Sequence, residues 1–279
     1  IAMLIQPANL RRVLLAAATV AAGAWQTAGA VGTAANTSIA NQATVSYSVG
    51  GNAQTPIPSS PTGNSTPGGG APTSFVVDNR IDLTVTELSG TNTPVTPGQL
   101  NQVTAFTVTN TGNGPQGYQL TPTNLAGGAV FGNTDNTDVA NLRVFVDSNG
   151  NSTYDAGVDT ATAIDTLAAD AGVVVFIVSD VPVTATNGQF ANVQLAARAA
   201  VPGTAGATLA AETAGADTPG AVDTVFGDAA RDATEVAADQ YAISSAALTV
   251  AKTSAVVQDP HNGATNPKAI PGAFVEYGI

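Results

Sequence analysis

Short runs of β-branched and aromatic residues, each closed by a turn sequence, recur along this chain and constrain its fold more than any other feature. The clearest run is Val103 to Asn110 (Val-Thr-Ala-Phe-Thr-Val-Thr-Asn), which is followed by Thr-Gly-Asn-Gly-Pro over 111–115. β-Branched side chains favour pleated strands, whereas Gly, Asn and Pro favour turns. The pattern predicts a strand that ends in a tight turn.

Runs of the same kind predict the other strands. They lie at 43–49, 74–77, 82–87, 117–120, 142–146, 173–178, 190–199 and 246–252. The first of them alternates strictly between apolar and polar residues, which predicts a half-buried strand. The Pro/Gly/Ser/Asn-rich stretch 50–72 predicts a flexible loop. Because no amphipathic helices separate the strands, the fold class predicted is all-β, an antiparallel β-sandwich with long loops.

One short helix is expected within this all-β pattern. Asp228 to Ala238 contains good helix formers, and Arg231 and Glu235 lie four residues apart, the spacing of an ion pair on a helix surface. Gly and Thr interrupt the rest of the Ala-rich region 196–242, which we expect to form loop or strand.

Charge and cysteine content exclude several classes of protein. The chain of 279 residues has 20 acidic and 8 basic residues, a net charge of −12, one His and no Cys. A basic surface for nucleic acid is therefore missing. Thiol catalysis, disulfides and cysteine-based zinc sites are excluded as well. Hydrophobic residues make up 44% of the chain, enough to build cores.

The first 30 residues have the pattern of a secretory signal peptide. Arg11 and Arg12 precede a small and apolar run from Val13 to Ala24, and Ala28-Gly29-Ala30 supplies a small-x-small cleavage pattern. The apolar run is too short for a membrane span of about 30 Å. The paired arginines leave a twin-arginine route open, but the ordinary secretory route is preferred. We therefore expect export, with no transmembrane span.

The sequence divides into four predicted parts. They are the signal peptide at 1–30, an N-terminal strand with a Pro/Gly/Ser-rich loop at 31–80, the main sandwich at 81–242, and final strands at 243–279. The sequence begins with Ile1 rather than Met and stops within a strand-like pattern. We expect it to be a fragment of a longer protein.

Residues 147–159 carry the one pattern with clear chemistry. They read Asp-Ser-Asn-Gly-Asn-Ser-Thr-Tyr-Asp-Ala-Gly-Val-Asp, directly after a predicted strand. A tight loop turns alternate residues inward, and Ca²⁺ accepts six to eight oxygen ligands at about 2.3–2.6 Å. The spacing of a calcium loop predicts that the ion is held by Asp147, Asn149, Asn151, the carbonyl of Thr153, Asp155 and Asp159.

This loop departs from the calcium-loop pattern at two positions. Ser152 stands where Gly normally supplies a left-handed backbone, a conformation that costs another residue about 1–2 kcal/mol. Val158 occupies the twelfth position, so Asp159 must replace the usual bidentate Glu one residue late. The alternative interpretation is a polar turn in which Asp and Asn cap backbone amides.

The rest of the sequence offers little chemistry. A second acidic group runs from Glu212 to Asp239, with Asp217, Asp223, Asp228, Asp232 and Glu235 between. Its spacing matches no calcium loop, so a solvated face is preferred over a second cation site. His261 lies in a turn-rich segment and is expected at the surface. Because no hydrolase, metalloprotease or phosphate-binding motif occurs, we expect no catalysis.

Three segments resemble a known family. They are Phe106 to Asn113, Asn41 to Tyr47 and Pro271 to Tyr277, and they resemble the conserved-repeat domain of unknown function that occurs in tandem in bacterial surface proteins. The resemblance implies an immunoglobulin-like β-sandwich in an exported, cell-surface, adhesin-like or structural protein. Residues 271–279 are similar to the opening strand of a repeat, and the loop at Asp147 to calcium loops of surface-protein repeats. The region 112–239 is much longer than one repeat.

Three hypotheses of function follow. The preferred one is a secreted or surface-displayed structural or adhesive sandwich stabilised by calcium. The second is a filament or surface-layer subunit, in which the strand at 43–49 or at 273–279 completes the sheet of another surface protein or of a copy of itself. The third is a carbohydrate-binding module or glycosidase acting on an extracellular glycan or matrix, although aromatic residues are only 5% of the chain.

Overall fold

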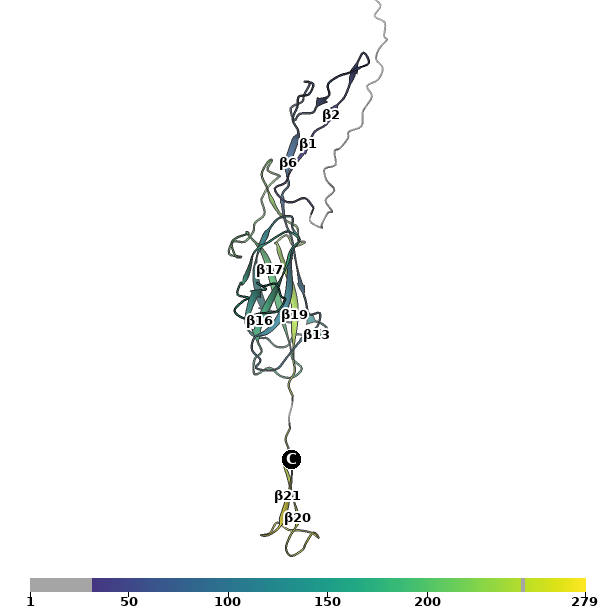
Figure 1. Cartoon of the computed structure of the whole chain (residues 1–279). Coiled ribbons are helices and arrows are strands. Elements are labelled where there is room, and N and C mark those ends of the chain that lie inside the picture. The colour runs from purple at the N-terminus through teal and green to yellow at the C-terminus, as the bar shows by residue number, and fades with distance from the viewer. Residues whose placement is uncertain (1–31, 247–248) are drawn as a thin grey trace, which may run out of the picture.

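The computed structural model describes residues 32–246 and 249–279, and these residues form strands, turns and loops without an α-helix (Figure 1). The fold is therefore all-β, as predicted. The expected signal peptide lies outside the described residues. No helix in this part of the chain is long and apolar enough to cross a membrane.

Two sheets form the sandwich. The first has the order β14-β16-β10-β8, and all its neighbours are antiparallel. The second has the order β15-β11-β17-β19-β9, in which only β9 runs parallel to its neighbour. The bounds are β8 (Leu83–Glu87), β9 (Thr93–Val95), β10 (Gln102–Asn110), β11 (Gln116–Asn124), β14 (Ala140–Val146), β15 (Ala163–Leu167), β16 (Gly172–Asp180), β17 (Phe190–Ala200) and β19 (Thr234–Ile243). These two sheets, antiparallel except for β9, make an immunoglobulin-like sandwich.

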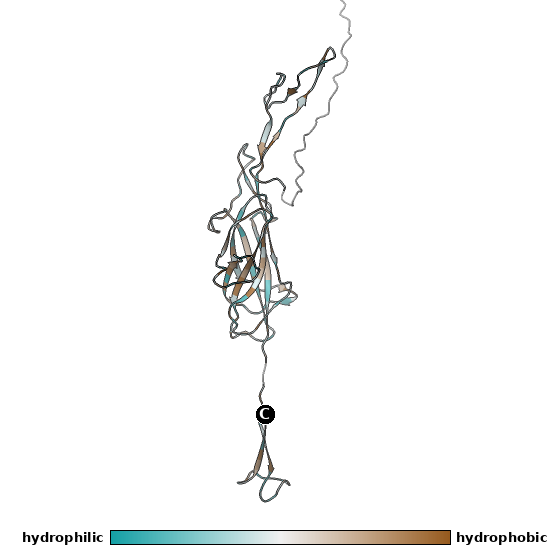
Figure 2. Cartoon of the chain, in the orientation of Figure 1, coloured by the Kyte–Doolittle hydropathy of each residue, from teal (hydrophilic) through white to brown (hydrophobic). Residues whose placement is uncertain are grey.

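The core lies between the inner faces of these two sheets. In β10 the inward positions alternate with half-buried ones, and Phe106 and Val108 are completely buried. Tyr118 of β11, Leu195 of β17 and Tyr241 of β19 face them from the second sheet. Figure 2 shows the hydrophobic residues concentrated in these central strands. Burial of each such side chain stabilises the fold by about 1.5–3 kcal/mol.

The turn after β10 is specified by its own residues. The amide of Asn110 donates to the carbonyls of Gly114 (2.9 Å) and Leu167 (3.0 Å), and its oxygen accepts the Gly112 N–H (3.0 Å). A Cβ at Gly112 would lie 2.4 Å from the Arg80 carbonyl oxygen, so only glycine fits. The turn therefore needs Asn at position 110 and Gly at position 112.

An N-terminal arm, residues 32–77, projects from the sandwich as a two-stranded ribbon (Figure 1). Its pairs are β1 (Ser38–Asn41) with β6 (Thr73–Val76), β2 (Thr44–Val45) with β5 (Ile57–Pro58), and β3 (Ser48–Val49) with β4 (Asn52–Ala53). The strand predicted at 43–49 is thus two short strands, and all its residues are exposed. The prediction of a half-buried strand was wrong because none of the strands that the structure describes forms a second layer over the ribbon. The predicted loop 50–72 contains β4 and β5.

The expected helix at 228–238 is also wrong, since β19 begins at Thr234. The Asp228 carboxylate accepts the N–H groups of Asp232 (3.0 Å) and Ala233 (2.9 Å), which folds the segment into a turn. Arg231 and Ala233 both have a φ of 54°, outside the helical region. Arg231 pairs with Glu212 rather than with Glu235.

The remaining strands form small pairs. They are β7 (Asn79–Ile81) parallel to β18 (Thr224–Phe226), β12 (Ala129–Val130) with β13 (Asn133–Thr134), and β20 (Thr253–Gln258) with β21 (Phe274–Gly278). The strand predicted at 246–252 lies partly outside the described residues, and residues 249–252 are not a strand. Residues 274–278 form the strand expected near the end of the sequence.

Candidate cation-binding sites

The loop 147–159 joins β14 of the first sheet to β15 of the second. Its base is closed by two backbone bonds, from Asp147 N–H to the Val174 carbonyl (2.9 Å) and from Val146 N–H to the Ala161 carbonyl (2.8 Å). Tyr154 stacks on Phe145, with ring centroids 5.3 Å apart, and meets the edge of Phe176 at 5.9 Å. The loop therefore folds back over the outer face of the first sheet and covers Phe176, which is 1% exposed.

Two carboxylates at the ends of the loop are buried and hold its backbone. Asp147 is 6% exposed and accepts the N–H groups of Gly150 (2.7 Å) and Ser152 (2.8 Å). Asp159 is 1% exposed and accepts those of Ser148 (2.9 Å) and Asp155 (2.7 Å). Ser152 has a φ of 60°, the left-handed backbone that this position was expected to need.

The middle of the loop gathers the other predicted ligands around Asp155. The amide nitrogens of Asn149 and Asn151 donate to its Oδ2 at 2.8 and 2.7 Å. These two bonds hold the pKa of the Asp155 carboxyl below its ordinary value. The amide oxygens of the two Asn accept the N–H groups of Asn151 (3.1 Å) and Thr153 (2.8 Å). A cation at this point would require the two amide groups to turn so that their oxygens face it.

Among residues 32–246 and 249–279, no basic side chain forms an ion pair with this loop. The ion pairs of residues 32–246 and 249–279 are Arg80–Asp82, Arg143–Asp180 and Arg231–Glu212, and none of them involves residues 147–159. Three carboxylates thus share 13 residues, two of them buried, with backbone N–H groups and Asn amides as their partners. Buried carboxylates without a countercharge are unfavourable, and a hard cation offsets their charge with the oxygen ligands that it prefers.

A second acidic cluster lies where the arm meets the sandwich. The carboxylate oxygens of Asp78, Asp217 and Asp223 lie within 4.8 Å of one another, which those of Asp147, Asp155 and Asp159 do not. Asp78 Oδ1 accepts the Asp223 N–H at 2.9 Å, and Asp223 Oδ2 accepts the Thr218 N–H at 2.8 Å. Sequence reasoning missed this cluster because Asp78 stands far from the other two in the chain. Only the pairing of β7 with β18 brings them together.

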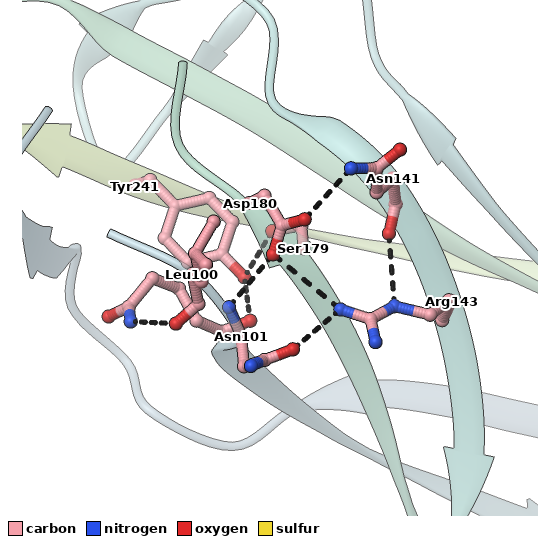
Figure 3. A network of polar contacts seen from close by, with 8 residues as sticks. Leu100, Asn101, Asn141, Arg143, Ser179, Asp180 and Tyr241 are labelled. Carbon is pink, nitrogen blue, oxygen red and sulfur yellow. Dashed lines mark hydrogen bonds and ion pairs between the residues drawn. The ribbon is translucent and has the colours of Figure 1, made fainter. Parts of the chain in front are cut away.

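A third polar cluster joins the two sheets (Figure 3). Asp180 accepts the Asn101 N–H at 2.9 Å and the Asn141 amide at 2.8 Å, and these bonds hold its pKa below the ordinary value. Beside it, the Ser179 hydroxyl donates to the Tyr241 hydroxyl (3.0 Å), which donates to the Gln102 carbonyl (3.1 Å). The polar groups of this cluster hydrogen-bond to one another and do not converge on an open position for a ligand. The cluster therefore holds the sheets together.

His261 is exposed, in keeping with the sequence, and its backbone N–H donates to Asp259 Oδ1 at 2.8 Å. Asp259 also accepts the N–H groups of Asn262 (2.6 Å) and Lys268 (2.5 Å). These bonds lower the pKa of Asp259 to about 2. The carboxylate therefore organises the connection between β20 and β21.

Comparison with known proteins adds little. No family model matches the chain, and no curated protein matches it. One similar solved structure is described as AvmM, which catalyses macrocyclization in alchivemycin A biosynthesis. The similarity covers 63% of this chain and 95% of that one, at 12% sequence identity and a TM-score of 0.27. A likeness at this level carries no argument about the function of this chain.

Proposed function

We propose that this chain is a calcium-stabilised β-sandwich module of a secreted or cell-surface bacterial protein, with a structural or adhesive role and no catalysis. The observation that carries the proposal is the loop 147–159, in which two carboxylates are buried without a basic partner among the residues that the structure describes. Calcium bound there would rigidify the connection between the two sheets and hold Tyr154 over Phe176.

The loop fits a hard cation by chemistry as well as by charge. Every predicted ligand is an oxygen, from Asp147, Asn149, Asn151, Thr153, Asp155 and Asp159, which is the donor set that calcium takes. The left-handed backbone at Ser152 allows the sharp bend that such loops make. The absence of cysteine gives an exported protein a reason to use a cation instead of a disulfide.

Export and surface display rest on the sequence. The signal-peptide pattern of residues 1–30 and the resemblance of residues 41–47, 106–113 and 271–277 to the bacterial surface-protein repeat both favour an extracellular protein. The immunoglobulin-like sandwich is compatible with that resemblance, although the same fold serves many functions.

Calcium titration by isothermal calorimetry tests the proposal. We expect binding with one calcium per chain, and we expect Asp159→Asn and the milder Asp155→Asn to weaken it at least tenfold, about 1.4 kcal/mol. Asp138→Asn is the matched control, because Asp138 is exposed and lies outside the loop. Asp217→Asn tests the second acidic cluster.

Two results would overturn the proposed site. One is the absence of calcium binding by the folded wild-type chain. The other is binding that Asp217→Asn abolishes while Asp155→Asn and Asp159→Asn leave it unchanged, which would place the ion at the second cluster.

A further inference from the structure

The N-terminal arm has an open edge whose backbone is free to pair. Within the ribbon, the Ala43 and Tyr47 carbonyls accept the N–H groups of Ser59 (2.7 Å) and Gln54 (2.9 Å). Residues of a strand turn their backbone groups alternately to its two sides. Thr44 of β2 and Ser48 of β3 therefore turn their N–H and carbonyl groups away from the ribbon, and no other strand of residues 32–246 and 249–279 pairs with this edge.

The two edges of the arm differ in sequence. The returning strand carries Pro56, Pro58 and Pro72, and proline is one of the devices that prevent an edge from pairing with another chain. The outgoing segment, residues 38–49 with β1, β2 and β3, contains no proline and no charged residue. Its side chains Val45, Tyr47 and Val49 are 62%, 37% and 61% exposed and lie on one face. The outgoing edge is therefore unprotected.

The charge distribution favours a second copy of the arm as the partner. Residues 32–77 contain no Asp, Glu, Lys or Arg, whereas residues 78–246 contain 18 acidic and 4 basic residues, a net charge of −14. Two sandwiches brought side by side would repel each other. Two uncharged arms that overlap in antiparallel orientation would meet without repulsion and keep the sandwiches at opposite ends, because the arm projects from the sandwich (Figure 1).

We propose that the outgoing edge of the arm, residues 38–49, pairs antiparallel with the same edge of a second copy and forms a two-fold dimer. A register with Ser46, which lies between β2 and β3, opposite Ser46 of the second copy pairs the outward backbone groups of Thr44 with those of Ser48. It also places Tyr47 of each copy opposite Val45 of the other, an aromatic and β-branched pair that stabilises sheets. The two ribbons then form one four-stranded sheet, which is more stable than an isolated two-stranded ribbon. This inference goes beyond the proposed function and is independent of calcium.

Sedimentation of the full chain at about 1–100 µM, a range that covers weak and moderate dimers, tests the inference. We expect a dimer that Ser46→Lys weakens at least tenfold, because two like charges would then lie opposite each other. Thr55→Lys is the matched control, since Thr55 is exposed and lies on the returning side of the ribbon, between β4 and β5. It should leave the dimer unchanged.

Cysteine cross-linking supplies a second readout in a chain that has no native cysteine. Hydrogen-bonded antiparallel partners have Cα atoms about 5.5 Å apart, within disulfide range. Ser46→Cys should therefore form a disulfide-linked dimer on mild oxidation, and Thr55→Cys should not. A chain that stays monomeric, equal effects of the two Lys variants, equal cross-linking of the two Cys variants, or a larger oligomer that persists in Ser46→Lys would each overturn the inference.

Discussion

At the scale of single residues, Asp239 is an ionisable group in an unusual position. Its side chain is completely buried in β19, where Oδ1 accepts the Gln240 N–H at 2.6 Å and Oδ2 has no hydrogen-bond partner among the described residues. Burial, with a contribution from the Glu87 carboxylate, raises the pKa of Asp239 to about 7. The folded protein therefore holds the proton of this carboxyl group more tightly than the unfolded chain does.

This shift predicts a pH dependence of the free energy of unfolding. The stabilisation from the protonated carboxyl is fully present below pH 3.8, the ordinary pKa, and is lost as the pH rises through about 7. Asn at position 239 does not titrate, so Asp239→Asn does not lose this stabilisation as the pH rises. The free energy of unfolding of the variant minus that of the wild type should therefore increase by on the order of 2–4 kcal/mol between pH 4 and pH 8. Urea unfolding at both pH values measures this change. The exposed Asp138→Asn should show none, and a constant difference for Asp239→Asn would contradict the account.

Residues that act through local geometry could be predicted from the sequence, whereas those that act through distant partners could not. The left-handed Ser152 followed from its place in the loop pattern, and the turn after Asn110 followed from Gly112. Asn113 shows the limit. Its amide donates to the Asp78 carbonyl at 2.8 Å and its oxygen accepts the Arg80 N–H at 2.7 Å. Nothing in the turn sequence indicates that the Asn113 side chain binds the backbone of residues 78–80, where the sandwich begins.

At the scale of elements, strands with a buried face were predicted well and exposed ones were not. The run Val103 to Asn110 corresponds closely to β10 (Gln102–Asn110), because its alternating side chains fill the core. The same alternation at 43–49 does not indicate burial, since no described strand packs on the arm as a second layer. At 228–238, the hydrogen bonds to the Asp228 carboxylate and the pairing of β19 with β17 stabilise a turn and a strand in place of the expected helix. Local sequence does not specify which segments acquire a neighbour.

The contact between the two sheets makes an element-level prediction at Tyr241. Its hydroxyl links β19 to Ser179 of β16 and Gln102 of β10, and both the tyrosine and Ser179 are completely buried (Figure 3). Burial raises its pKa to about 12, so the hydroxyl stays protonated and able to donate. Tyr241→Phe should lower the free energy of unfolding by about 1–3 kcal/mol, because buried partners lose their bonds.

Chemical denaturation of Tyr241→Phe measures that loss. Tyr277→Phe serves as the control, because Tyr277 is 62% exposed and lies in β21, outside the sandwich. Equal stabilities of the Tyr241 and Tyr277 variants would show that the hydroxyl does not hold the sheets together.

At the scale of the whole molecule, the acidic residues are unevenly distributed. The acidic residues gather in the sandwich and its loops, and the arm has none. The loop 147–159 was predicted as a site because its ligands are close in sequence, and the structure brings its Asn and Asp side chains into contact. The cluster of Asp78, Asp217 and Asp223 depends on strand pairing between distant segments, so spacing along the chain does not reveal it.

Thermal unfolding of the full chain with calcium and with excess chelator tests the central claim, that a cation in the loop 147–159 stabilises the sandwich. At a calcium concentration a hundredfold above Kd, binding adds about 2.7 kcal/mol to the free energy of unfolding. That gain corresponds to several degrees in Tm. We predict that chelation lowers the Tm of the wild type by that amount and lowers the Tm of Asp159→Asn by about half as much or less, because a site weakened at least tenfold adds no more than about 1.4 kcal/mol at the same calcium concentration. An identical wild-type Tm with calcium and with chelator would contradict the account.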